Sequence, residues 1–148
     1  MNRAVIHEAG HAILALHFGF NVEQIEVKDG LTRIVISDFD NPGRTATEKC
    51  LVLAGGISNE SRMIGNYDPG AIGSDQEQIK LRGGGNIVDY LTEAEKVLNA
   101  YKPSLDLLVE RLSVRWVTAR AEAQFSGDPN SYELLSGSEL EEIWREGS

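Results

Sequence analysis

The chain has 148 residues, of which 41% are hydrophobic and 25% are charged, the composition of one soluble globular domain. Its net charge of -9 argues against binding to nucleic acid or to an anionic membrane surface. No apolar run approaches the roughly 18 residues of a membrane span, no secretory signal pattern is present, and the single cysteine, Cys50, excludes an intramolecular disulfide. We therefore expect a soluble cytoplasmic protein with no nucleic acid partner and no membrane insertion.

The first twenty residues are predicted to form an amphipathic helix. Apolar side chains recur there at steps of three and four residues, and Gly19 is a suitable stop. Two short apolar segments follow, residues 22–27 and 31–36, with Asp29-Gly30 between them. An Asp-Gly pair between two such segments is a strong short-range signal of a β-hairpin.

A second helix is predicted to start at Thr45 or Thr47 and to run to about Ile64. Its centre is apolar and rich in small residues, including Gly55 and Gly56. A glycine inside a helix costs about 1 kcal/mol relative to alanine, so we expect another backbone to pack closely against this helix.

Residues 65–73 are predicted to form a loop, after which Ser74 caps a third helix. Glu77 stands three residues after Ser74, as in a capping box, and this helix ends at Gly83-Gly84-Gly85. A loop is expected over residues 127–132, and three further helices over residues 86–100, 103–123 and 139–145, the last capped by Ser138. The pattern predicts a mainly helical α+β fold with one small β-hairpin or sheet.

His7-Glu8-Ala9-Gly10-His11 in the first helix matches the pattern H-E-x-x-H. Residues four apart on a helix are rotated by about 40° and lie about 6 Å apart along its axis, so both imidazoles can bind one tetrahedral zinc ion. Zinc lowers the pKa of a bound water to about 7, and Glu8 is placed to take the proton of that water. The resulting hydroxide can attack a carbonyl, after which Glu8 passes the proton to the departing amine. We expect a Zn²⁺ site with His7 and His11 as ligands and Glu8 as the catalytic base.

The motif leaves the third protein ligand open, and His17 is one alternative. His17 follows His7 by ten residues, which is the metzincin spacing, but Leu14 replaces the glycine that breaks the helix in that pattern. In a continuous helix, His17 is rotated by about 240° from His11 and lies about 9 Å further along the axis. It then points elsewhere, as a histidine favoured by the dipole at the helix C-terminus.

A carboxylate from a later helix is the other possibility for the third ligand. Glu48, Glu60 and Glu77 are available, and the spacing selects none of them. We prefer Asp75, because it lies in the first turn of the third predicted helix, after a glycine-bearing loop. On composition alone, however, Asp75 is better explained as a first-turn acid that complements the helix dipole.

Several segments resemble the peptidase domain of FtsH-type proteases, the proteolytic part of the ATP-dependent AAA proteases. Residues 4–12, Ala-Val-Ile-His-Glu-Ala-Gly-His-Ala, are similar to the zinc helix of that family. Leu53-Ala54-Gly55-Gly56 and the later Glu60 are similar to its small-residue helix. Gly73-Ser74-Asp75 resembles the segment that supplies an aspartate as third zinc ligand, and residues 135–143 resemble the final turn and acidic helix. The resemblance spans nearly the whole chain.

The resemblance implies an FtsH-type helical fold in which His7, His11 and Asp75 bind zinc and Glu8 is the base. Glu77 is an alternative ligand, since the run after Asp75 is more polar than in the family and the register could slip. The chain lacks the G-x-x-x-x-G-K-[ST] motif of an ATPase module, so the resemblance implies a stand-alone relative or a piece excised from a larger protein.

We expect one metallopeptidase-like domain over residues 1–148, with the zinc site in about 1–82 and a C-terminal helical part in about 86–148. The leading prediction is a zinc metalloendopeptidase that hydrolyses peptides or unfolded proteins. The alternatives are a catalytically inactive module that binds zinc or another protein, and a proteolytic subunit served by a separate ATPase. A homo-oligomer is a further possible assembly.

Overall fold

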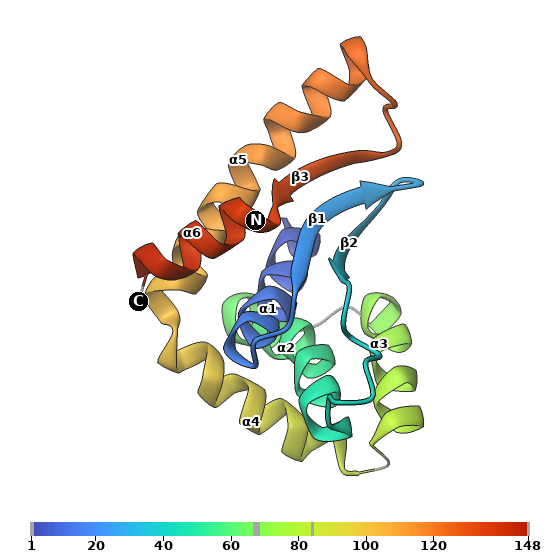
Figure 1. Cartoon of the computed structure of the whole chain (residues 1–148), viewed down its shortest axis with the longest axis vertical. Coiled ribbons are helices and arrows are strands. Elements are labelled where there is room, and N and C mark those ends of the chain that lie inside the picture. Colours follow the sequence, from blue (N-terminus) through green and yellow to red (C-terminus); the bar gives the residue numbers. More distant parts are fainter. Residues whose placement is uncertain (1, 67–68, 84, 148) are drawn as a thin grey trace.

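Six helices and three strands make up the part of the chain that the computed structural model describes, which is residues 2–66, 69–83 and 85–147, with only the backbone for residues 69–72. The strands form an antiparallel sheet in the order β2-β1-β3, so the predicted mainly helical α+β class is confirmed. The elements, shown in Figure 1, are α1 (Arg3–His17), β1 (Val22–Lys28), β2 (Leu31–Ile36), α2 (Ala46–Ile64), α3 (Pro69–Arg82), α4 (Ile87–Ala100), α5 (Lys102–Ser126), β3 (Tyr132–Ser136) and α6 (Gly137–Gly147).

The first helix and the hairpin form where they were predicted. The side chain of Asn2 caps α1 by accepting hydrogen bonds from the backbone of Ala4 and Val5, and the chain leaves the helix through Gly19 with φ of +72°. Asp29 and Gly30 have φ of 51° and 80°, and positive φ at both positions is the signature of a type I′ turn. That turn matches the twist of β1 and β2 and so sets the hairpin register.

The close packing expected at the glycines of α2 is present. A Cβ atom on Gly10 of α1 would lie 2.2 Å from the carbonyl oxygen of Gly55, so the two backbones touch where neither residue has a side chain. The helix starts at Ala46 with Thr45 as its cap, and Glu48 completes the capping box, which excludes the later start at Thr47.

The prediction for the start of α3 is wrong. The helix begins at Pro69, so Ser74 lies inside it and does not cap it, and much of the predicted loop 65–73 is helical. Proline suits the first turn of a helix because its missing N–H would have no partner there. Residues 67 and 68 of that loop, and Gly84 of the predicted stop, lie outside the described residues, but the end of α3 at Arg82 agrees with the prediction.

The third strand was not predicted. Residues 132–136 pair with β1, about a hundred residues earlier in the chain, and α6 follows directly from Gly137. The cap of α6 is Ser136, not Ser138, because the Ser136 hydroxyl accepts from the backbone N–H of Glu139 and the Glu139 carboxylate accepts from that of Ser136. A Cβ on Gly137 would lie 2.6 Å from the carbonyl oxygen of Val22, so glycine lets this corner approach β1.

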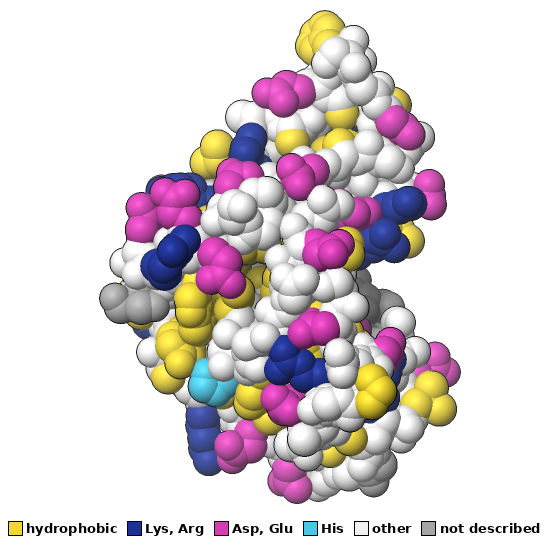
Figure 2. Space-filling model, in the orientation of Figure 1, with side chains coloured by type: hydrophobic (Ala, Val, Ile, Leu, Met, Phe, Trp, Pro, Cys, Tyr) yellow, Lys and Arg dark blue, Asp and Glu magenta, His cyan; other side chains and the backbone are white. Residues whose placement is uncertain are grey.

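The helix that carries H-E-x-x-H lies at the centre of the molecule. Every residue of α1 from Val5 to Ala15 is buried, and the helix packs against α2, α4, α5 and the β1–β2 hairpin. Acidic and basic side chains are interspersed over the face shown in Figure 2, without one continuous patch of either sign. None of the described helices is both long and apolar enough to cross a membrane.

Candidate metal centre

His7, Glu8 and His11 lie together in the buried stretch of α1. One potential ligand atom from each of the three lies within 4.8 Å of the others. The two imidazoles are held edge to face, with ring centroids 4.5 Å apart and an interplanar angle of 86°. The helical spacing of four residues therefore brings both rings to one point, as the motif requires.

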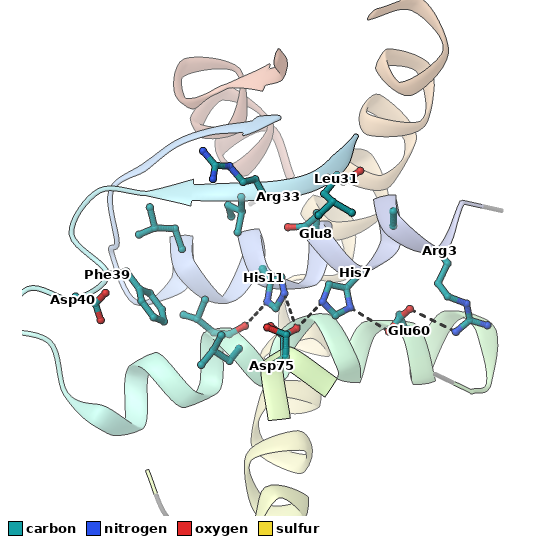
Figure 3. Close-up of a pocket in the computed structure, with 17 residues that line it drawn as sticks. Arg3, His7, Glu8, His11, Leu31, Arg33, Phe39, Asp40, Glu60 and Asp75 are labelled. Carbon is teal, nitrogen blue, oxygen red and sulfur yellow. Dashed lines mark hydrogen bonds and ion pairs between the residues drawn. The ribbon is translucent and has the colours of Figure 1, made fainter. Parts of the chain in front are cut away.

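Asp75 reaches the same point from α3. Its Oδ2 lies 2.7 Å from Nε2 of His7 and 3.2 Å from Nε2 of His11 (Figure 3). Two ligands of a tetrahedral zinc with ordinary bond lengths lie about 3.3 Å apart. The distances from Oδ2 of Asp75 to the two Nε2 atoms thus differ from this value by about 0.6 Å and about 0.1 Å. Two imidazole nitrogens and a carboxylate oxygen are also a donor set that zinc accepts.

The far nitrogen of each imidazole has a partner that orients the ring. Nδ1 of His11 donates to the carbonyl oxygen of Val52 at 2.8 Å, and Nδ1 of His7 lies 3.2 Å from Oε2 of Glu60. Glu60 is fully buried, and a guanidinium nitrogen of Arg3 lies 3.6 Å from its other oxygen. Hydrogen bonds of this kind fix the tautomer that leaves Nε2 free to bind a metal.

Gly56 of α2 makes room for both rings. A Cβ built on Gly56 would lie 2.8 Å from Cε1 and Nε2 of His11 and 2.8 Å from Cε1 of His7. Any side chain at this position would displace the imidazoles, so the glycine is part of the site's geometry.

Glu8 is buried but incompletely paired. Its side chain points towards β2 (Figure 3), and among the described residues its Oε2 has no hydrogen-bond partner. Burial raises the pKa of Glu8, although the charges of His11 and His7 and the backbone of Ile34 oppose this effect. A carboxyl group with an elevated pKa and a free oxygen beside a metal site is suited to accepting and returning a proton.

His11 and Asp75 shift the pKa values of each other. Burial lowers the pKa of His11, but its hydrogen bond to Asp75 and the charge of that carboxylate outweigh burial and raise the pKa to about 9. The pKa of Asp75 falls well below its usual value, because hydrogen bonds and charge from His11 and His7 outweigh its own burial. Asp75 is thus an ionised carboxylate between two ring nitrogens, a place where a divalent cation can replace the shared protons.

Three of the alternative ligands, His17, Glu77 and Glu48, lie elsewhere. Nδ1 of His17 is 3.1 Å from the hydroxyl of Tyr101, and the His17 ring packs against Phe18. Glu77 is exposed on α3 and does not line the cleft that contains the histidines. Glu48 belongs to the cap of α2.

An open cleft of about 870 Å³ runs past the histidines between β2 and the helices α1 and α2. Phe39 and Asp40 stand at the end beyond His11 in Figure 3, and Arg3 and Glu60 stand at the end beyond His7. The sequence did not predict roles for Arg3, Phe39 or Val52. No signal could have found the Val52 carbonyl, since every residue has one and only the packing of α1 on α2 selects it.

Comparison with known proteins adds no identification. No protein-family model matches the chain, and no curated protein gives a significant match.

Proposed function

We propose that this protein is a zinc-dependent metalloendopeptidase of FtsH type that hydrolyses peptides or unfolded proteins. The observation that carries the proposal is the meeting of Nε2 of His7, Nε2 of His11 and Oδ2 of Asp75 at one point beside the partly unpaired carboxyl group of Glu8. The three donors come from two helices and lie in an open cleft. A structural zinc site is normally closed by four protein ligands, whereas three protein ligands beside an open cleft favour a catalytic site.

Each residue of the site has a separate role in the proposed hydrolysis. His7, His11 and Asp75 would hold the metal, which when bound polarises a carbonyl and acidifies a water. Glu8 takes a proton from the attacking water and returns it to the departing amine, and its raised pKa suits both steps. Glu60 and Val52 hold the two imidazoles in the tautomer that the ligands need.

The resemblance to FtsH-type peptidases supports the same assignment. In that arrangement two histidines of one helix are joined by an aspartate from a later helix. Here Asp75 lies 68 residues after His7 in the sequence and 2.7 Å from it in space. The glycines that the resemblance placed in the small-residue helix lie directly against the two histidines and Gly10.

The first test combines metal analysis with a substitution of the base. Elemental analysis of the purified protein is expected to give about one zinc per chain. Glu8→Gln is expected to keep the zinc and to lower casein cleavage by at least about a hundredfold, since the variant cannot accept the proton of the attacking water. A wild type that binds zinc but cleaves neither casein nor mixed peptides would support an inactive zinc-binding module. A wild-type protein without zinc would contradict both the peptidase proposal and the alternative of an inactive zinc-binding module.

The second test concerns the third ligand. Asp75→Ala removes an atom that lies against both Nε2 atoms and is expected to release most of the zinc during dialysis. Glu77→Ala, two residues further along the same helix, is the matched control and is expected to retain it. The reverse outcome would show that the ligand is Glu77 and that the assignment of Asp75 is wrong.

A further inference from the structure

The end of the cleft beyond His11 is a ready-made pocket for a substrate side chain. The apolar residues that line the cleft include Ile36, Phe39, Val52 and Leu53, and the Val52 carbonyl holds His11. Asp40 stands beside Phe39 at this end in Figure 3 and pairs with Arg82. The pocket therefore belongs to the same cleft as the proposed metal centre.

The wall of this pocket is held in place from behind. The guanidinium of Arg82 lies 5.0 Å from the centre of the Phe39 ring, and the ring of Phe20 lies 5.8 Å away on the core side. Arg82 also pairs with the neighbouring Asp40. A pocket formed before binding loses little side-chain entropy when it is filled, which favours one class of side chain over others.

The strand above the cleft sets the direction of a bound peptide. β2 is an outer strand of the described sheet, and it runs from Leu31, on the His7 side, towards Phe39, on the His11 side (Figure 3). An extended peptide can add to such an edge through main-chain hydrogen bonds, and antiparallel pairing is the more stable arrangement. Its chain would then enter at Phe39 and leave at Leu31, so the residue over the pocket precedes the bond at the metal centre.

From these contacts we infer that this pocket selects a large apolar side chain, such as Phe, Leu or Met, on the amino-terminal side of the scissile bond. The inference rests on the proposed peptidase function. It adds the class of substrate side chain and the direction of the bound peptide, which the zinc ligands by themselves do not define.

Binding can be measured apart from cleavage. The zinc-loaded Glu8→Gln protein is titrated with two fluorescein-labelled peptides that differ only in a central Phe or Ser. The Phe peptide is expected to bind at least about tenfold more tightly, as burial of one large apolar side chain requires. Equal affinity for the two peptides would contradict the inference that the pocket selects a large apolar side chain, whether or not the wild type is active.

Two substitutions fill or polarise the pocket. Leu53→Trp fills the pocket, whereas Leu53→Gln keeps the volume of the side chain but adds an amide. Each substitution is expected to abolish the preference for the Phe peptide over the Ser peptide, while the zinc content stays at the wild-type level. The matched control is Leu81→Trp, on an exposed leucine of α3 outside the cleft, which is expected to leave the preference unchanged. Circular dichroism identifies any variant that fails to fold, and a preserved preference in either folded Leu53 variant would contradict the inference.

The positions of the cleavage sites test the direction in which the peptide binds. Mass spectrometry of casein digested by the wild type is expected to show Phe, Leu and Met enriched on the amino-terminal side of the cut. Enrichment on the carboxy-terminal side alone would refute the antiparallel placement. If casein stays intact while the Phe peptide still binds preferentially, the peptidase proposal fails and the apolar binding pocket stands.

Discussion

At the scale of single residues, the proposed metal centre depends on side chains that do not themselves touch the metal. Glu60 is the clearest case, because its carboxylate is fully buried between Nδ1 of His7 and the guanidinium of Arg3. A buried acid with these partners has an orienting role, whereas a surface acid of the same type has none.

Removal of Glu60 is therefore expected to weaken metal binding. Glu60→Ala leaves His7 free to rotate and to change tautomer, and the zinc dissociation constant should rise about 10- to 100-fold. Competition with a chromophoric chelator measures the constant, and Glu77→Ala on the exposed face of α3 is the control. Unchanged affinity in the Glu60 variant would show that packing alone orients the imidazole.

At the scale of elements, the contact between α1 and α2 determines whether the site exists. Gly10 lies between the two histidines in the sequence, and it faces Gly55 without a side chain on either helix. The same approach of the helices brings Val52, Gly56 and Glu60 of α2 against the imidazoles.

A methyl group at this contact is expected to separate the helices. Gly10→Ala would place its Cβ 2.2 Å from the Gly55 carbonyl oxygen and 2.8 Å from Cβ of Asn59. Overpacking of this kind lowers the free energy of unfolding by about 1–3 kcal/mol, and thermal denaturation should detect it. Gly73→Ala in α3 has nothing within 4 Å of the new atom and is expected to be neutral or slightly stabilising. Equal melting temperatures of the two variants would contradict the packing argument.

At the scale of the whole molecule, the metal would join parts of the chain that are otherwise held by few interactions. α3 contributes Asp75, yet Ile79 is the one fully buried residue among its described side chains. A zinc ion bound only by the folded state would tie this helix to α1 and stabilise the protein by mass action.

Metal removal is therefore expected to lower the melting temperature. Free zinc at a thousand times its dissociation constant stabilises the folded state by about 4 kcal/mol, which corresponds to roughly 10 °C for a domain of this size. Calorimetry with and without a chelator measures the shift. Asp75→Ala should melt at the same temperature in both conditions, and a wild type insensitive to the chelator would argue against a bound metal.

The local features of this protein were determined by sequence alone. The spacing of His7, Glu8 and His11 follows from the helix repeat, and the Asp29-Gly30 turn follows from the backbone freedom of those two residues. Both depend on neighbours within a few residues, so a pattern in the chain suffices to predict them.

Only the tertiary structure decided which distant groups complete the site and the sheet. β3 is too short to be distinguished from a loop until β1 pairs with it, and Glu60 differs from Glu77 only in being buried against His7. Asp75 was preferred for an expected place in the first turn of a helix, which the start of α3 at Pro69 does not give it, and the family resemblance supported it further. Its position beside both Nε2 atoms required the packing of α3. Contacts between residues more than fifty positions apart depend on how whole elements pack, which no short stretch of sequence encodes.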